Sequence, residues 1–109
     1  MISMKPAELL TDTHALLGDR ARLAIMATLA ATKEPIDFAT LLDSVNLTKG
    51  NLSAHAQKLE EAGLIKVKKE FVGRKPRTTY ACTDRGRGEV KNYLSKVEQL
   101  LRQTKKGSR

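Results

Sequence analysis

The 109-residue sequence has no tryptophan, one cysteine and two histidines. A single cysteine cannot form an internal disulfide, and so few histidines and cysteines do not show the spacing of metal ligands. No apolar run approaches the roughly 20 residues that cross a bilayer, and the N-terminus lacks the basic-then-apolar order of a signal peptide. These absences predict a cytoplasmic protein with no membrane partner, no bound metal and no other cofactor.

The sequence also lacks a recognisable catalytic constellation. Glu60 and Glu61 are adjacent carboxylates, but they lie past the middle of a predicted helix, where they solvate its end. No nucleophile stands beside a base, and no glycine-rich phosphate loop follows a predicted strand. The sequence therefore predicts a protein that is not an enzyme.

Positive charge is what the sequence has in excess. The net charge is +8, and it is spread unevenly along the chain. Residues 1–46 carry 4 basic and 6 acidic side chains, residues 47–87 carry 10 and 4, and residues 88–109 carry 6 and 2. A basic excess favours a polyanionic partner, and its concentration after residue 46 favours nucleic acid over a membrane surface.

Two helices are predicted in the first third of the chain. The first begins near Pro6, which suits a first helical turn, and ends at Gly18. The second is capped by Asp19 and is the expected central core helix. Their apolar stripes are Leu9, Leu10, His14 and Leu17 in the first helix, and Leu23, Ile25, Met26 and Leu29 in the second. His14 is therefore expected in an interface or in the core.

Two closely spaced helices follow. Asp37 is predicted to cap a helix over residues 38–45, and Asn46, which tolerates left-handed backbone, is predicted to end it. Thr48 is predicted to cap the next helix, and Gly63 to end it in the left-handed conformation. A connection of only two residues between the helices indicates the angled pair of a helix-turn-helix.

The helix that follows Thr48 has one apolar face and one small, polar face. Leu52, Ala56 and Leu59 share the apolar face, and the outward residues are small enough to enter a major groove. The predicted DNA contacts of this helix are Thr48, Lys49, Gly50, Asn51, Ser53, Ala54, His55, Gln57 and Lys58. His55 lies near the boundary of the two faces, so a half-buried packing role and a phosphate contact are both open.

A β-hairpin with a basic tip is predicted next. Residues 65–68 and 78–82 are β-prone runs separated by a loop that contains Gly73 and Pro76. Ile36 is expected to add a very short edge strand, and Cys82 to act as a small buried hydrophobe. The predicted DNA contacts of the tip are Arg74, Lys75, Pro76, Arg77 and Thr78.

The basic residues of the tip suit different parts of a duplex. A guanidinium loses less hydration than an ammonium on insertion, so Arg74 and Arg77 are the better minor-groove candidates. Lys75 suits a phosphate, and Pro76 is expected to stiffen the tip.

The last helix is predicted to start after Thr83 and to carry an apolar stripe that is too long for so small a core to cover. The predicted homodimer interface combines this stripe with the first helix: Leu9, Leu10, Val90, Tyr93, Val97, Leu100 and Leu101. The whole chain, residues 1–109, is expected to be one domain. Within it, residues 1–17 hold a dimerisation helix, 18–83 the core, 84–104 a second dimerisation helix, and 105–109 a mobile basic tail.

This order of elements, mainly α-helical with one small β-hairpin, resembles the winged helix-turn-helix transcriptional regulators of the ArsR and MarR-like type. The resemblance is carried by residues 17–26, 47–65 and 71–78, the last of which lead into 82–86. Its most specific part is Gly-Arg-Lys-Pro-Arg-Thr at 73–78, which is similar to the wing of compact stand-alone winged-helix DNA-binding proteins. The resemblance implies a homodimer with the recognition helix in the major groove of double-stranded DNA and the wing over the backbone or in the minor groove.

Two departures from this family bear on function. ArsR-type metal sensors carry paired cysteines on the recognition helix or Asp and His ligands on the last helix, whereas here the recognition helix has no cysteine and the last helix no histidine. Ala54 stands where ArsR-type proteins often have an arginine, which removes one candidate guanine contact. Base reading would then depend on Asn51, Ser53, Gln57 or DNA shape.

The predicted function is sequence-specific regulation of transcription by a DNA-binding homodimer. The alternative is a basic winged-helix module that binds RNA or an acidic protein. Single-stranded binding is disfavoured because each of the four aromatic residues is predicted to lie in an apolar pattern and not on an exposed platform: Phe38, Phe71, Tyr80 and Tyr93.

Overall fold

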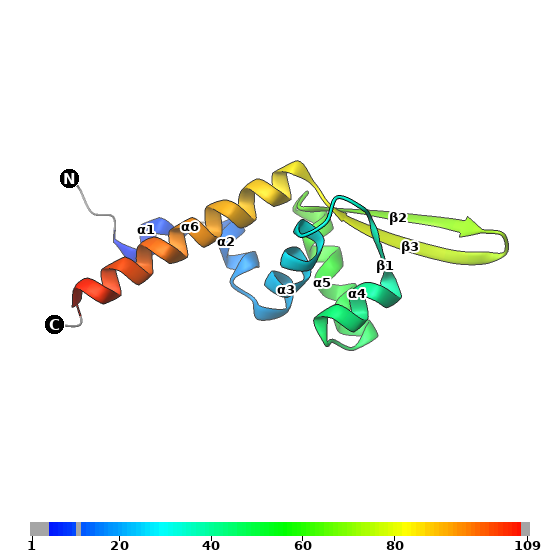
Figure 1. Ribbon diagram of the computed structural model, residues 1–109, viewed down its shortest axis with the longest axis horizontal. Helices are drawn as coiled ribbons and strands as arrows, with labels where there is room; N and C mark the ends of the chain where they lie inside the picture. Colours follow the sequence, from blue (N-terminus) through cyan, green and yellow to red (C-terminus); the bar gives the residue numbers. More distant parts are fainter. Residues whose placement is uncertain (1–4, 11, 108–109) are drawn as a thin grey trace.

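The computed structural model describes residues 5–10 and 12–107 (Figure 1). In this part of the chain, short helices α1 (Pro6–Leu9) and α2 (Asp12–Leu17) precede α3 (Arg20–Ala30), strand β1 (Ile36–Asp37), α4 (Phe38–Val45) and α5 (Lys49–Glu61). Strands β2 (Ile65–Val72) and β3 (Lys75–Cys82) form a hairpin, and α6 (Asp84–Gly107) follows. Helices α3, α4 and α5 form the body, from which the hairpin and α6 extend in opposite directions (Figure 1).

Side-chain caps start three of the helices where the sequence predicts them. In each case a side-chain oxygen accepts the backbone N–H three residues further on. The pairs are Asp19 with Arg22 at 3.0 Å, Asp37 with Thr40 at 2.8 Å, and Thr48 with Asn51 at 3.1 Å. Local chemistry therefore fixes where α3, α4 and α5 begin.

The ends of α4 and α5 are also as predicted. Asn46 takes φ +54° after α4, and Gly63 takes φ +76° after α5. Behind α5, the Gly63 N–H donates to the Glu60 carbonyl at 2.9 Å, and the Leu64 N–H donates to the Leu59 carbonyl at 3.0 Å. This pair of bonds is a Schellman motif, which satisfies the last carbonyls of the helix and turns the chain into β2.

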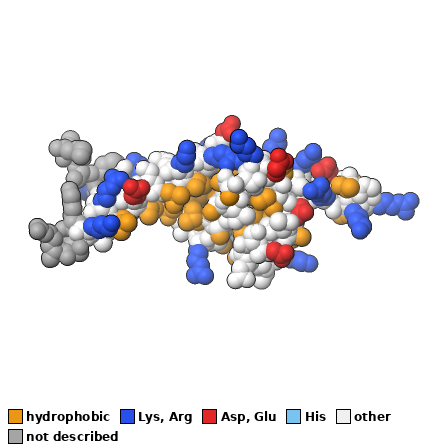
Figure 2. Space-filling view, viewed as in Figure 1, with side chains coloured by type: hydrophobic (Ala, Val, Ile, Leu, Met, Phe, Trp, Pro, Cys, Tyr) orange, Lys and Arg blue, Asp and Glu red, His pale blue; other side chains and the backbone are white. Residues whose placement is uncertain are grey.

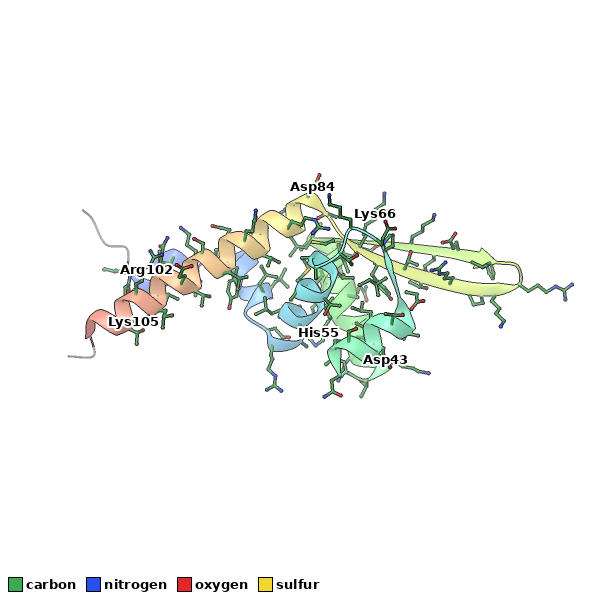
Figure 3. The ribbon with its side chains drawn as sticks, in the orientation of Figure 1. Asp43, His55, Lys66, Asp84, Arg102 and Lys105 are labelled. Atoms are coloured by element: carbon green, nitrogen blue, oxygen red, sulfur yellow. The ribbon has the colours of Figure 1, made fainter. Side chains whose placement is uncertain are left out.

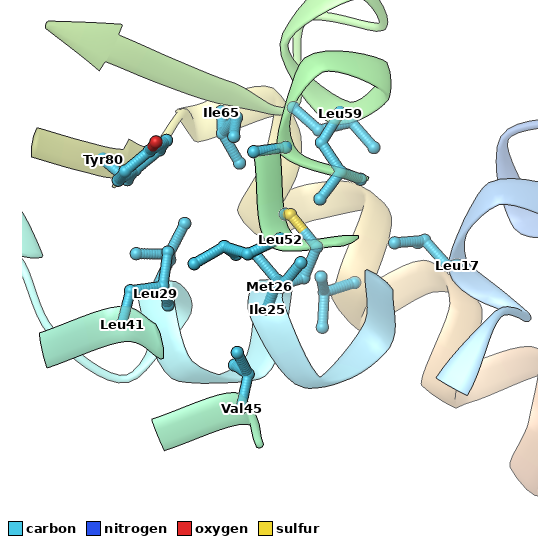
Figure 4. Close-up of a cluster of buried hydrophobic side chains, with 13 residues drawn as sticks. Leu17, Ile25, Met26, Leu29, Leu41, Val45, Leu52, Leu59, Ile65 and Tyr80 are labelled. Atoms are coloured by element: carbon cyan, nitrogen blue, oxygen red, sulfur yellow. The ribbon is translucent and has the colours of Figure 1, made fainter. Parts of the chain in front are cut away.

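The three strands form one antiparallel sheet in the order β1-β3-β2. Ile36 pairs with Tyr80, which confirms the predicted short edge strand. Side chains from α3, α4 and α5 pack against the sheet in a single core (Figure 4), which also includes Leu17 of α2 and Val90 of α6. The buried residues are Leu17, Ile25, Met26, Leu29, Leu41, Val45, Leu52, Ala56, Leu59, Leu64, Ile65, Tyr80 and Val90.

Helix α2 is held against α6 through His14. Its side chain is 2% exposed, its Nε2 lies 3.1 Å from Asn92 Nδ2, and its ring lies 5.6 Å from the Tyr93 ring. His14 is therefore a core residue, one of the two positions that the sequence allowed.

The start of α6 is fixed to the end of α5. The Thr83 hydroxyl accepts the Gly86 N–H at 2.9 Å, as the predicted cap requires, and donates to the Gly63 carbonyl at 2.8 Å. A Cβ atom at Gly86 would overlap the backbone carbonyl oxygen of Leu64. Only glycine therefore lets α6 pass this close to the turn.

Two predicted helix boundaries were wrong. The first helix is divided into α1 and α2, a division that the apolar spacing did not reveal. Helix α6 continues to Gly107, so residues 105–107 are helical and are not an irregular tail. The remaining tail residues 108–109, and residues 1–4 and 11 of the segment predicted to hold the first dimerisation helix, lie outside the described residues.

The hairpin is longer than predicted. Its strands reach Val72 and Lys75, and the turn has only two residues, Gly73 with φ +66° and Arg74. Pro76 is therefore in β3, paired with Phe71, and not in the loop. Proline is tolerated there because β1 reaches only Thr79 and Tyr80, which leaves this part of β3 at a sheet edge.

Candidate nucleic-acid interface

Helix α5 presents the small, polar face that its sequence predicts. Leu52, Ala56 and Leu59 are at most 3% exposed and attach the helix to the core. The opposite residues are exposed: Thr48, Lys49, Gly50, Asn51, Ser53, Ala54, Gln57 and Lys58. A Cβ atom at Gly50 would have no neighbour within 4 Å among the described residues, so the surface of α5 is open at this position.

His55 is the exception on this helix, because it is half-buried between α5 and α3 (Figure 3). Its Nδ1 lies 3.2 Å from Nη1 of Arg22 on α3. Since a guanidinium can only donate, Nδ1 accepts this bond and the ring proton is on Nε2. The structure therefore gives His55 an internal packing contact.

Arg22 connects α5 to the residues before and at the start of α3. Its Nε donates to the Leu16 carbonyl at 2.8 Å, and its Nη1 lies 3.9 Å from the Asp19 carboxylate as well as near His55. The backbone N–H of Arg22 lowers the pKa of Asp19, and the Arg22 guanidinium lowers it further. Sequence analysis missed this role, because no local pattern pairs residues 22 and 55.

The hairpin of residues 65–82, called the wing from here on, carries six basic side chains and one acidic side chain. Arg74, Lys75, Pro76 and Arg77 are exposed and Thr78 is half-buried. Oε1 of the acidic residue, Glu70, lies 3.8 Å from Nζ of Lys68. Lysine and arginine side chains therefore dominate the end of the wing (Figure 2).

A groove of about 370 Å³ connects α5 to the wing. Ser53, Gln57 and Glu60 line it from α5, and Val67 and Lys69 line it from β2. The predicted contacts on the helix thus continue onto the wing as one surface. Glu60 is the acidic residue that lines this groove, and its negative charge partly offsets the positive charge of Lys69.

One aromatic residue was placed wrongly from sequence. Phe71 is 74% exposed, although its apolar pattern predicted a packed position. The wing extends past the body (Figure 1), and the high exposure of Phe71 shows that its side chain is largely uncovered. Phe38, Tyr80 and Tyr93 do pack against the core, as predicted.

The predicted dimer residues divide by their exposure in one protomer. Leu9 and Val90 are buried within the chain, and Tyr93 and Leu100 are half-buried. Leu10, Val97 and Leu101 are exposed by 42%, 39% and 51%. Leu94, also on α6, is 50% exposed, and Figure 2 shows hydrophobic side chains along this helix.

Residues 5–10 and 12–107 were compared with the features of a metal site, a membrane-spanning helix and a reactive thiol. No three His, Cys, Asp or Glu side chains of these residues come together as metal ligands would. Within the same range, no helix combines the length and apolar character needed to span a membrane. Cys82 is a half-buried thiol, and burial raises its pKa, which favours the unreactive protonated form.

Comparison with known proteins gives consistent matches. A family model described as "Winged helix DNA-binding domain" matches residues 21–101. An uncharacterized protein of Methanocaldococcus jannaschii is 38% identical over 79 residues, which are 72% of this chain and 85% of that protein.

Solved structures agree with this match. A transcriptional regulator homologue from Pyrococcus horikoshii superposes with a TM-score of 0.80 at 31% identity, covering 93% of this chain and 98% of that one. A MarR-family regulator from Silicibacter pomeroyi matches with a TM-score of 0.64 at 20% identity, over 95% of this chain and 68% of that one. The second likeness concerns the fold alone.

Proposed function

The chain belongs to the winged helix DNA-binding domain family, and from this premise we propose that it is a transcriptional regulator that binds double-stranded DNA sequence-specifically as a homodimer. The observation that carries the proposal is the continuous surface of α5 and the wing. A small, polar helix face lies beside a hairpin with six basic side chains. A major groove admits such a helix, and the phosphates on either side attract the wing.

The two halves of this surface have different roles in the proposal. Asn51, Ser53 and Gln57 read base edges from α5, since their side chains donate and accept hydrogen bonds. Thr48, Lys49, Lys58 and Lys75 contact phosphates, and Arg74 and Arg77 enter or border the minor groove. Gly50 and Ala54 allow close approach of the helix to the bases. Pro76 and Thr78 belong to β3, the strand of the wing that faces the DNA backbone in this proposal.

His55 has a supporting role in this proposal. Its bond to Arg22 favours holding α5 at a fixed angle over direct contact with DNA. The remaining Nε2–H is a donor that a phosphate oxygen can accept without breaking that bond.

The proposed dimer is formed in each protomer by the C-terminal half of α6 and by Leu10, which follows α1. Leu10, Val97, Leu100 and Leu101 make the contact, and Leu9, Val90 and Tyr93 support it from beneath. An isologous pairing of this kind presents two recognition helices about 34 to 36 Å apart, which is one turn of DNA. Two-fold symmetric half-sites are the expected target.

A competition experiment tests the proposal against its alternative. A labelled 30-base-pair duplex bound by the protein is challenged with unlabelled duplex, with each single strand, and with an RNA of the same sequence. The proposal predicts that only duplex DNA competes efficiently. Stronger competition by RNA or single strands would favour the alternative, for which the exposed Phe71 ring is the one supporting observation.

A further inference from the structure

The end of the wing carries exposed apolar side chains among its cations. Phe71 is 74% exposed and Val72 is 55% exposed, and the exposed Pro76 pairs with Phe71 across the ladder. Single exposed hydrophobic residues are common, but an aromatic ring and a proline that are cross-strand partners at the end of a projecting hairpin form a small apolar surface. The basic side chains needed for phosphate binding do not explain it.

The pleat of β2 places Phe71 on the side of the wing that faces α5. Alternate residues of a strand share a face, so Phe71 lies on the same face as Val67 and Lys69. Val67 and Lys69 line the groove together with Ser53 and Gln57 of α5. Phe71 is four residues beyond Val67, or about 13 Å along the strand. A ligand that binds α5 and extends along the groove would therefore reach the Phe71 ring.

The charges around this ring favour one kind of surface. Lys69 is exposed on the same face as the ring, and Arg74 is exposed in the adjoining turn. Glu70 projects from the opposite face together with its cross-strand partner Arg77 and with Lys75, and it is near Lys68. An apolar centre with a basic rim complements a surface with an apolar floor and anionic walls. The minor groove of DNA has this character, because sugar and base edges lie between two phosphate backbones.

We propose that Phe71, supported by Pro76, is an apolar wedge that enters the minor groove next to the site of α5, partly unstacks a base step and bends the duplex. This inference rests on the proposed function. The ring has only two side-chain torsions and its neighbour is a proline, so little conformational freedom is lost on insertion. Unstacking one step is costly, but the bend brings more of the basic wing against the backbone. Flexible TA and CA steps are the expected position of the wedge.

The experiment uses a 30-base-pair duplex that contains TA and CA steps and carries a donor and an acceptor dye at its two ends. Wild type is compared with Phe71→Ala, with Val72→Ala as a matched truncation on the other face, and with Arg74→Ala as a charge variant. Energy transfer between the dyes reports bending, and fluorescence anisotropy reports affinity at several salt concentrations. Urea unfolding of each variant checks the fold, which exposed substitutions leave intact.

The wedge predicts that wild type increases energy transfer and that Phe71→Ala abolishes the increase. The same variant weakens binding about tenfold and leaves the salt dependence unchanged, because no charge is lost. Val72→Ala stays within about twofold of wild type in affinity. Arg74→Ala reduces the salt dependence but keeps the bend.

Four results would overturn the inference, with three different consequences. Wild type that binds the duplex without bending it, or Phe71→Ala that binds and bends like wild type, removes the wedge and leaves DNA binding in place. Wild type that binds no duplex DNA removes the proposed function as well. Phe71-dependent binding to vesicles of phosphatidylglycerol and phosphatidylcholine, with duplex binding independent of Phe71, would assign the tip to a membrane surface.

Discussion

The apolar stripe on α6 predicts that Val97→Glu combined with Leu101→Glu yields a folded monomer. Both side chains are about half exposed in one protomer, at 39% and 51%. Full burial of a valine or leucine contributes about 1.5 to 3 kcal/mol, so each half-exposed side chain has roughly 1 kcal/mol to gain in an interface. Four such side chains in two protomers amount to about 4 kcal/mol, which is roughly a thousandfold in the dimer dissociation constant.

Sedimentation equilibrium of wild type and variant across micromolar concentrations measures this shift. Burial of four added carboxylates weakens association further, so the thousandfold change is a lower bound. The matched control is Lys91→Gln with Ser95→Glu, which has the same spacing and the same change in net charge on exposed positions of α6. The control should remain a dimer, and both variants should unfold in urea as wild type does.

Binding to DNA should change with the oligomeric state. A monomer has one recognition helix, so the variant should lose most of its affinity for a two-half-site duplex while the control keeps it. Wild-type protein that sediments as a monomer at tens of micromolar would refute the reasoning. In that case a different partner covers the stripe.

The remaining predictions concern charge, base reading and packing. Contacts to about 6 to 10 phosphates by a dimer predict that affinity falls roughly 10³- to 10⁵-fold between 50 and 200 mM salt, and a flat response in an anisotropy titration would contradict them. Arg74→Ala should weaken binding to every duplex alike, whereas Gln57→Ala should change the preference for particular bases by about 1 to 3 kcal/mol. If both variants lose the same affinity on all sequences, Gln57 does not read bases. Gly86→Ala should lower the free energy of unfolding by about 3 kcal/mol in urea titrations, because overlap with the Leu64 carbonyl outweighs the roughly 1 kcal/mol gain in helix propensity. Gly88→Ala, whose Cβ meets open space, should instead be stabilising, and equal effects of the two would exclude the overlap as the cause.

Local signals account for what the sequence predicted well. The caps at Asp19, Asp37 and Thr48 and the helix end at Gly63 each depend on residues within five positions of one another. Their chemistry is therefore readable before any tertiary contact is known. Helix α5 and its exposed face could be predicted because the boundaries of the helix and its buried stripe are both local.

Long-range contacts account for what was missed. The bond between Arg22 and His55 joins positions 33 residues apart, and nothing in either neighbourhood indicates it. Phe71 shows the reverse case, because its pattern is typical of a buried strand residue but the wing extends beyond the body. Whether an apolar position is covered depends on where the strand ends relative to the core, and strand length was the feature that sequence underestimated.

Selection of bound duplexes from a random pool tests the central claim most directly. Double-stranded oligonucleotides with a randomised central region are incubated with the protein, recovered and sequenced over several rounds. A homodimer that reads bases through α5 predicts an enriched motif with two-fold symmetry and half-sites about one helical turn apart. A pool that stays unenriched, or a motif without symmetry, would contradict sequence-specific recognition of duplex DNA by a two-fold dimer.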